Sequence, residues 1–339
     1  MLERLSIENF TVFSKANFEF AAGLNVIVGE NSTGKTHVLK LAYAVLAENY
    51  YQGKLKPDSV PNEATLQQHY ARKMDNVFHS RGVDGLIRGS EVELSVSFEF
   101  DEAGLNCAFT VDTFMLGEIR KKPNQWLDVR PVFIPTRELL TIYPGFVSLY
   151  EGRFLEFEET YRDTCLLLGE PPLKKPMVDL LSILENSMGG KISLDNGRFY
   201  LVLSDNKKME MPLVAEGIRK LAMLAQLIAV GALQKGGYLF WDEPEANLNP
   251  RLIKVVARVI LQLAKAGIQI FIATHSYFLL KELDILTMEQ PIPTRYFSLL
   301  KGEDGVVVES GDSLDDLQTI VALDEELAQF DREQDAHHA

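Results

Sequence analysis

Short continuous apolar runs alternate along this chain with longer segments in which apolar residues recur at helical spacing. The apolar runs occupy residues 24–28, 237–243 and 267–273, and helical spacing extends over residues 35–48 and 250–265. Continuous apolar strands that alternate with amphipathic helices are typical of a parallel sheet buried on both faces. The pattern therefore predicts an α/β fold.

The middle of the chain has a different pattern. Residues 90–112 alternate between apolar and polar and predict the strands of an antiparallel side sheet. Residues 153–188 predict helices interrupted at 169–172, and residues 191–203 predict a hairpin that turns at Asp195-Asn196-Gly197. These segments predict a helical lobe or insertion beside the sheet.

Residues 29–36 read Gly-Glu-Asn-Ser-Thr-Gly-Lys-Thr, directly after the first apolar run. Gly29 and Gly34 let the backbone curl so that successive N–H groups point at a β-phosphate, and Lys35 adds a positive charge near the β- and γ-oxygens. The Thr36 hydroxyl can ligate Mg²⁺, and the helix that follows directs its dipole at the phosphates. The predicted nucleotide-binding residues of this loop are Gly29, Asn31, Ser32, Thr33, Gly34, Lys35 and Thr36.

The second apolar run ends in two carboxylates, Asp242 and Glu243. Paired with a phosphate-binding loop, Asp242 is expected to hold the Mg²⁺ shell, and Glu243 is expected to polarise the attacking water. The alternative is a polar turn in which Pro244 merely ends the strand.

Two further elements follow the carboxylates. The loop 245–250 leads into the helix 250–265, and its Asn247 is counted among the nucleotide-binding residues. The third apolar run ends at His275, at the edge where open α/β sheets bind ligands, so His275 is expected to donate a hydrogen bond to the γ-phosphate. A capping or surface histidine is the alternative.

The order of these motifs resembles that of the ABC-type ATPases of the SMC/RecF/OLD group, in particular the stand-alone prokaryotic AAA family ATPases. The N-terminal segments 5–10, 18–20 and 23–29 look like the strands that enter the phosphate-binding loop in that group. The resemblance covers roughly residues 1–50 and 210–300. It implies a P-loop fold with an antiparallel side sheet and a helical lobe, and ATP with Mg²⁺ as cofactors.

The resemblance also implies a signature segment whose N-terminus reaches the γ-phosphate held by a second subunit in a head-to-tail dimer. Here Ala215 stands where the usual Ser would be, with Glu216 beside it. A carboxylate facing a phosphate is unfavourable, so the contact is expected from the Gly217 backbone and from Arg219 or Lys220. The alternative is an amphipathic core helix.

A Q-loop equivalent is expected at residues 132–138, where a short apolar strand runs into polar residues. This segment has no Gln. Thr136, Arg137 and Glu138 are the alternatives for a metal or water contact, and an ordinary exit from a strand would have the same pattern.

Composition limits the class of protein further. The chain has 339 residues, 46% of them hydrophobic, and only Cys107 and Cys165, which favours a reducing compartment without a disulfide framework. No apolar signal region or run of about eighteen apolar residues is present. A cytoplasmic protein with no membrane partner is expected.

The net charge of −14 is concentrated at the C-terminal end. From Ser310 onward there are nine Asp and Glu but only Arg332 as a base, so this end is a solvated or docking segment, with short helices expected to about Phe330. Short basic runs occur at 120–122, 174–175 and 207–208 and fall short of a DNA-binding stripe. DNA is therefore the less favoured partner.

These observations predict a single ABC-type ATPase domain. Residues 1–135 and 210–310 would form the nucleotide-binding lobe, 136–209 a helical lobe or insertion with a hairpin, and 311–339 an acidic C-terminal segment. No long heptad repeat predicts an SMC arm, and the 64 residues after His275 are too few for an OLD-type nuclease domain.

The resemblance leaves three functions open. The favoured one is an ATP-gated switch or scaffold, a homodimer or higher oligomer, that controls a separate effector protein in a prokaryotic anti-phage defence system. A RecF-like DNA repair or recombination ATPase is the alternative. The energising subunit of an ABC transporter is third, since a Ser-Gly-Gly signature and a Q-loop Gln are both missing from the expected positions.

Overall fold

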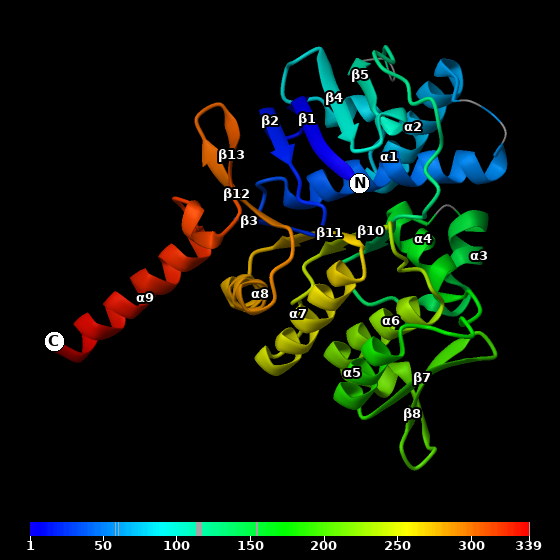
Figure 1. Cartoon of the computed structure of the whole chain (residues 1–339), viewed down its shortest axis with the longest axis vertical. Coiled ribbons are helices and arrows are strands. Elements are labelled where there is room, and N and C mark those ends of the chain that lie inside the picture. The colour runs from blue at the N-terminus through cyan, green and yellow to red at the C-terminus, as the bar shows by residue number, and fades with distance from the viewer. Residues whose placement is uncertain (58, 60, 113–116, 154, 339) are drawn as a thin grey trace.

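A six-stranded mixed sheet lies at the centre of the computed structural model, which describes residues 1–57, 59, 61–112, 117–153 and 155–338 (Figure 1). Five of its strands are parallel, and the sixth is an antiparallel edge strand. In spatial order the strands are β13 (Gly305–Gly311), β12 (Thr294–Gly302), β3 (Leu24–Gly29), β11 (Gln269–Thr274), β10 (Tyr238–Asp242) and β6 (Val132–Ile134). The α/β fold and the three apolar strands expected from the sequence are confirmed.

The two faces of this sheet belong to different cores. Ile27 and Phe271 face one side, where they join a cluster rich in aromatic rings. Val26, Ile272 and Trp241 point to the other side, into a core built mainly by helices. Burial on both faces explains why these strands are continuously apolar rather than alternating.

A four-stranded antiparallel sheet forms a second layer above the first face. Its order is β2 (Phe13–Glu19), β1 (Leu2–Phe10), β4 (Glu93–Phe100) and β5 (Cys107–Asp112). In β4, buried residues alternate strictly with partly exposed ones, as the sequence pattern of 90–112 predicts.

Helix α1 (Lys35–Leu55) lies between the two sheets, and α2 (Glu63–Phe78) packs beside it (Figure 1). Most of α1 is buried, because one helix supplies core residues to both layers. This placement extends α1 seven residues beyond the end expected at residue 48. The helix dipole is therefore fixed in the body of the protein with its positive end at the phosphate-binding loop.

Helices cover the other face of the central sheet. They are α3 (Tyr143–Arg153), α4 (Glu159–Leu168), α5 (Val178–Met188), α6 (Glu216–Ala229), α7 (Pro250–Lys265) and α8 (Tyr277–Glu289). The break between α4 and α5 contains the expected Pro-rich interruption at 169–172, whereas α3 begins well before the helical region expected at 153.

A small three-stranded sheet, β7 (Gly190–Asp195), β8 (Arg198–Leu203) and β9 (Lys208–Glu210), lies at the end of the helical layer. The β7–β8 hairpin turns through Asn196 and Gly197, both at positive φ, as the Asn-Gly pair predicts. Helix α6 packs on α5 across this region. The proposed boundaries between lobes stay predictions.

The C-terminal segment ends in α9 (Val321–His338), which projects away from the body of the molecule (Figure 1). It is preceded by the short 3₁₀ turn Leu314–Asp316. The expectation of short helices ending near Phe330 was wrong, because one helix continues beyond that residue. Among the described residues no helix is long and apolar enough to cross a membrane.

Candidate functional site

The phosphate-binding loop connects β3 to the N-terminus of α1, as predicted. Ser32 and Gly34 adopt positive φ angles of 67° and 88°. A Cβ on Gly34 would lie 2.6 Å from the Phe13 ring, so glycine is required here by both conformation and space. No acidic residue occupies the first turn of α1, and this leaves its N-terminal dipole free to attract an anion.

Lys35 folds back over this loop. Its Nζ donates hydrogen bonds of 2.7 Å to the backbone oxygens of Gly29 and Glu30. Burial lowers the pKa of Lys35, and this is opposed by the negative charges of Glu243 and Asp242. A polyphosphate would give the ammonium a charged partner in place of two neutral carbonyls, so the loop suits the ligand that its sequence predicts.

The two expected metal ligands are in contact. The Thr36 hydroxyl donates to the Asp242 carboxylate, with distances of 2.9 and 3.1 Å to its two oxygens. Thr136 Oγ1 lies 3.3 Å from Asp242 Oδ2, so one of the three Q-loop alternatives reaches the same carboxylate. Burial raises the pKa of Asp242, and the neighbouring Glu243 charge raises it further.

This group of oxygens fits Mg²⁺. Mg²⁺ commonly binds one or two protein oxygens and completes its shell with waters and substrate phosphates. Among the described residues no cluster of three or more His, Cys, Asp or Glu is placed to hold a metal. The hydroxyl of Thr36 and the carboxylate of Asp242 would supply the protein's share of the shell, and a divalent cation would relieve the cost of the buried charge.

Glu243 and His275 lie at the ends of neighbouring strands and contact each other. His275 Nδ1 is 3.2 Å from Glu243 Oε1. Glu243 has a φ of 47°, a conformation that non-glycine residues seldom adopt and that often marks functional positions. The sequence placed each of these residues at the C-terminal end of a strand, and the structure shows that the two strands are neighbours.

Glu245 is a site residue that the sequence reasoning did not identify. Its buried carboxylate accepts a 2.6 Å hydrogen bond from the Thr274 hydroxyl and lies 3.9 Å from His275 Nδ1. It joins the loop after β10 to the end of β11. The sequence signal was a third carboxylate, two residues after Glu243, in a segment too polar to be expected in a core.

Lys220 approaches the site from α6. The residue is only 2% exposed, and its Nζ donates to the backbone oxygens of Glu243 at 2.6 Å and Ala246 at 3.3 Å. Burial lowers the pKa of Lys220 to about 8, against the raising effect of Glu245 and other nearby carboxylates. The ammonium that was one alternative for a contact with a partner's phosphate is thus engaged within its own chain.

The signature segment is packed against the loop that contains Asn247. The Asn247 amide donates to the Glu216 carboxylate at 2.8 Å, and a Cβ on Gly217 would lie 3.0 Å from the Asn247 carbonyl oxygen. Arg219 is paired with Glu138 at 2.7 Å, so its guanidinium would have to leave that carboxylate to reach a partner's phosphate. The nucleotide contacts of Glu216, Gly217, Arg219 and Asn247 stay predictions.

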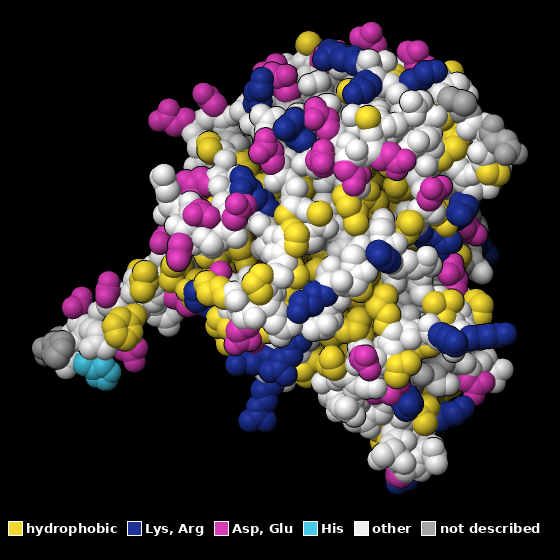
Figure 2. Space-filling view, in the orientation of Figure 1, with side chains coloured by type: hydrophobic (Ala, Val, Ile, Leu, Met, Phe, Trp, Pro, Cys, Tyr) yellow, Lys and Arg dark blue, Asp and Glu magenta, His cyan; other side chains and the backbone are white. Residues whose placement is uncertain are grey.

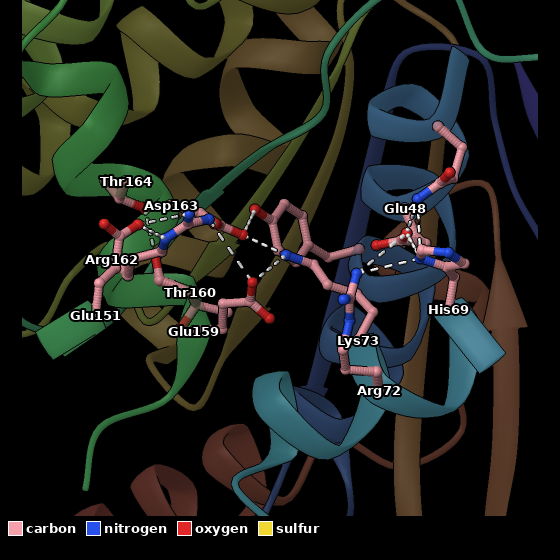
Figure 3. A network of polar contacts seen from close by, with 12 residues as sticks. Glu48, His69, Arg72, Lys73, Glu151, Glu159, Thr160, Arg162, Asp163 and Thr164 are labelled. Carbon is pink, nitrogen blue, oxygen red and sulfur yellow. Dashed lines mark hydrogen bonds and ion pairs between the residues drawn. The ribbon is translucent and has the colours of Figure 1, made fainter. Parts of the chain in front are cut away.

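A second polar network ties the phosphate-binding helix to α2 and α4 (Figure 3). Lys73 of α2 contacts the buried Asp163 at 2.5 Å and Glu159 at 3.4 Å. Tyr43 of α1 donates to Asp163 at 2.8 Å, and Lys40 of α1 contacts Glu158 at 2.6 Å. The network fixes the position of α1, and with it the loop at its N-terminus.

The fold is that of a P-loop NTPase of the ABC type. A family model described as "AAA domain, putative AbiEii toxin, Type IV TA system" matches residues 122–281, and a model described as "AAA domain" matches residues 4–72. The expected resemblance to the SMC/RecF/OLD group is confirmed at this level.

Solved structures of SMC heads share the fold. The SMC head domain from Thermotoga maritima superposes with a TM-score of 0.53 at 14% identity, covering 91% of this chain and 98% of that one. An Smc head bound to the C-winged helix domain of ScpA superposes with a TM-score of 0.58 at 14% identity, covering 93% of this chain and 98% of that one. An Smc head from Pyrococcus furiosus, bound to the C-terminal domain of ScpA, superposes with a TM-score of 0.54 at 13% identity, covering 98% of this chain and 99% of that one.

Curated relatives match over a short stretch only. The DNA replication and repair protein RecF from two strains of Streptococcus suis is 35% identical over 57 residues. That stretch covers 17% of this chain and 16% of each relative. The chain thus shares the fold of the SMC heads and matches AAA-domain family models over parts of its length.

Proposed function

We propose that this protein is an ATP-gated switch that binds Mg·ATP, dimerises head to tail and hydrolyses the nucleotide to reset itself. The contact between the Thr36 hydroxyl and the Asp242 carboxylate carries the proposal. These two residues are 206 positions apart in the chain, and the fold brings together the two groups that a nucleotide-bound Mg²⁺ requires.

Different residues of the site have different roles in hydrolysis of the γ-phosphate. Mg²⁺, when bound, neutralises charge on the β- and γ-phosphates. Lys35 leaves its two carbonyl partners and binds phosphate oxygens. Glu243 orients and polarises the attacking water, and His275 holds the Glu243 carboxylate at 3.2 Å until its ring turns toward the γ-phosphate.

A second copy would complete the site. The signature segment contacts the Asn247 loop of its own chain, and among the described residues no hydrogen bond or ion pair joins it to the phosphate-binding loop. Lys220 connects the same segment to the backbone of Glu243. A phosphate of the second copy that binds the N-terminus of α6 would therefore act directly on the loop that holds the proposed general base, which would make hydrolysis depend on dimerisation.

The role of the switch is proposed to be control of a separate effector in prokaryotic anti-phage defence. The family model over residues 122–281 is described by a toxin of a type IV toxin–antitoxin system, which favours this role. The acidic C-terminal helix offers a surface to another protein rather than to nucleic acid. The Smc heads that share the fold bind ScpA, so a protein partner suits this architecture.

A RecF-like role in DNA repair is the second candidate. The 57-residue match to RecF favours it, although it covers a small part of both chains. This alternative requires DNA to stimulate ATP hydrolysis, which the net charge of −14 does not favour.

The test is the light-scattering mass of wild type and Glu243→Gln with and without Mg·ATP, with phosphate release measured in the same samples. We expect Glu243→Gln to bind ATP, to shift to a dimer and to lose turnover. Glu91→Gln, at an exposed carboxylate outside the site, should behave as wild type. Absence of ATP binding would overturn the ATPase proposal, and stimulation of turnover several-fold by duplex DNA would favour the repair role.

A further inference from the structure

Beyond Leu323, helix α9 exposes an apolar stripe that no element in the described part of the chain covers. Leu323, Leu327 and Phe330 follow one another at spacings of four and three and so lie on one face of the helix. Leu327 is 55% exposed and Phe330 is 57% exposed, whereas Leu323 packs against the protein's own core. Figure 2 shows this projecting helix bearing hydrophobic and acidic side chains. Large apolar side chains on a projecting helix indicate a docking surface.

Acidic residues surround this stripe. The acids of α9 are Asp324, Glu325, Glu326, Asp331, Glu333 and Asp335, and Arg332 is the one Lys or Arg of the helix. The surface that covers α9 should therefore combine exposed apolar side chains with a positive charge.

The protein itself has such a surface on α7 and α8. Arg251, Lys254 and Arg258 lie at helical spacing on the exposed face of α7, a helix that contains no acidic residue. Arg251 and Arg258 form no ion pair with any acidic side chain in the part of the chain that the structure describes, and Lys254 makes one long contact of 3.8 Å with Glu282 of α8. Figure 2 shows Lys and Arg side chains gathered over the lower end of α7.

Helix α8 packs beside α7 and adds the apolar component. Phe278, Ile285 and Met288 lie on one exposed face of α8 and are 39%, 40% and 60% exposed. Lys281 occupies the same face. The α7/α8 surface, defined by these side chains and the basic residues of α7, therefore presents apolar and basic groups side by side.

The N-terminal end of α9, its root, lies at the phosphate-binding loop. Val321, Ala322 and Glu325 line a cavity together with Asn31 and His275. From this root the helix projects outward (Figure 1), and its 18 residues span about 27 Å. In a head-to-tail dimer, the phosphate-binding loop of one copy faces the signature segment of the other, and α7 begins directly after the Asn247 loop that packs on that segment.

We infer that α9 docks on the α7/α8 surface of a second copy of this chain. Its apolar stripe covers Phe278, Ile285 and Met288, and its acids face Arg251 and Arg258. This inference rests on the proposed head-to-tail dimer and deepens it, because α9 starts next to the phosphate-binding loop and would bind the second copy from there. Intramolecular docking is excluded in the observed arrangement, since α9 extends away from the body of its own chain (Figure 1).

The first test measures dimerisation of Glu243→Gln with Mg·ATP by sedimentation, with and without Leu327→Ser plus Phe330→Ser. Both side chains are exposed, so the substitutions leave the monomer folded. We expect dimerisation to weaken about 10-fold or more, because two apolar side chains are no longer buried. Gln329→Ser plus Arg332→Ser, on the opposite face of α9, is the matched control and should dimerise normally.

The outcomes separate the two proposals. If Glu243→Gln gains no mass with Mg·ATP, the proposed function fails. If it dimerises and the stripe variant dimerises equally well, the docking of α9 is overturned and the proposed function stands.

The second test locates the contact. Copies carrying Phe330→Cys are mixed with copies carrying Met288→Cys in Mg·ATP and treated with a short bismaleimide, since the two native cysteines are buried. We expect a covalent dimer from this mixture and none when the second copy carries Val92→Cys, an exposed position on the side-sheet lobe. Cross-linking within one chain that carries both cysteines, with none between mixed copies, would overturn the inference.

Discussion

Lys220 Nζ lies 2.6 Å from the backbone oxygen of Glu243 and so fastens the signature helix α6 to the loop of the proposed general base. The same ammonium reaches the Ala246 carbonyl, one residue before Asn247. Glu243 has a backbone conformation that costs energy, at φ 47°. A charge-assisted hydrogen bond from a buried cation is the kind of contact that holds such a conformation in place.

Replacing Lys220 with Met should impair catalysis more than nucleotide binding. Met keeps the packing volume but loses both hydrogen bonds, each worth about 1.5–3 kcal/mol when a charged group is involved. We expect kcat to fall roughly 10- to 100-fold with little change in KM. Steady-state phosphate release checks this, with the exposed Lys174→Met as control. A proportional rise in KM with unchanged kcat would show that Lys220 acts on binding instead.

The pH dependence of activity should report the same group. The pKa of Lys220 is lowered to about 8 from 10.5 by burial. Activity should therefore decline above about pH 8 as the ammonium loses its proton, and this decline should be absent from the residual activity of Lys220→Met. Phosphate release measured from pH 6.5 to 9.5, with nucleotide saturating, is the experiment. An identical high-pH limb in both proteins would assign the decline to another group.

Stability should respond to pH with the opposite sign. Between about pH 8 and 10.5 the unfolded chain keeps the Lys220 proton and the folded chain does not. The free energy of unfolding should therefore gain a contribution that rises with pH through this window. Urea unfolding of wild type and of Lys220→Met at pH 8 and pH 10 tests this. The free energy of unfolding of wild type should rise between the two pH values relative to that of Lys220→Met.

The sequence predicted the parts of this site that depend on local pattern. Gly34, Lys35 and Thr36 follow an apolar strand, and Asp242 and Glu243 end another, so these strands and the phosphate-binding loop could be deduced. What the sequence could not provide is which side chains are held from a distance. The engagement of Lys220 with the Glu243 backbone depends on the packing of α6 against the loop after β10, which no local periodicity encodes.

The helical layer was predicted less well for a similar reason. Helix α3 begins at Tyr143 and is kinked at Pro144 and Gly145, residues that normally end a helix in a sequence-based prediction. Short helices were expected to about Phe330 from the spacing of apolar residues, whereas the structure has the single helix α9 from Val321 to His338. Its length and its exposed apolar face became visible only in three dimensions.

Asp242→Asn should stabilise the ligand-free protein while removing its response to metal. Burial raises the pKa of Asp242, so the folded carboxyl keeps its proton at pH values where the unfolded one, at 3.8, has lost it. The free energy of unfolding thus falls as pH rises through that window, and the charged form costs stability at neutral pH. Asn keeps an acceptor for the Thr36 hydroxyl without the charge.

We expect Asp242→Asn to raise the free energy of unfolding by ~1 kcal/mol without ligand. Mg·ATP should raise the melting temperature of wild type and of the exposed-site control Asp304→Asn, but not that of Asp242→Asn. Thermal unfolding with and without Mg·ATP makes the comparison. An unchanged Mg·ATP shift in Asp242→Asn would remove this carboxylate from the metal site.

Gly217→Ala should uncouple dimerisation from nucleotide binding. A Cβ at this position would lie 3.0 Å from the Asn247 carbonyl oxygen and 3.2 Å from Leu248, so the loop must shift. The phosphate-binding loop is not touched, and ATP affinity of the monomer should be unchanged. We expect the ATP-dependent mass increase of Glu243→Gln to weaken several-fold when Gly217→Ala is added.

The matched control for Gly217→Ala is Gly152→Ala. Gly152 lies in α3, and a Cβ there would meet nothing within 4 Å. Light scattering and equilibrium titration with a fluorescent ATP analogue measure the two quantities separately. Loss of ATP affinity in Gly217→Ala would show that the segment serves its own chain's nucleotide.

The buried pair Lys73 and Asp163 should show strong energetic coupling (Figure 3). Lys73→Met removes the ammonium from the buried Asp163 carboxylate and leaves Arg162, 3.0 Å away, as its remaining charged partner, so the loss should lie toward the lower end of the roughly 3–5 kcal/mol that breaking a buried pair costs. Adding Asp163→Asn removes the buried carboxylate charge but keeps an acceptor for the Tyr43 hydroxyl. The double variant should therefore regain a large part of the loss.

Urea unfolding of wild type, Lys73→Met, Asp163→Asn and the double variant gives the coupling energy of this pair as a double-mutant cycle. The exposed pair Lys208 and Asp195, 2.7 Å apart on the small sheet, is the control and should show little coupling because water screens it. Since Lys73 and Asp163 hold α2 and α4 against Tyr43 of α1, Lys73→Met should also weaken ATP binding through the displaced helix. Additive effects of the two substitutions would show that the pair does not act as a unit and that α1 is positioned by packing alone.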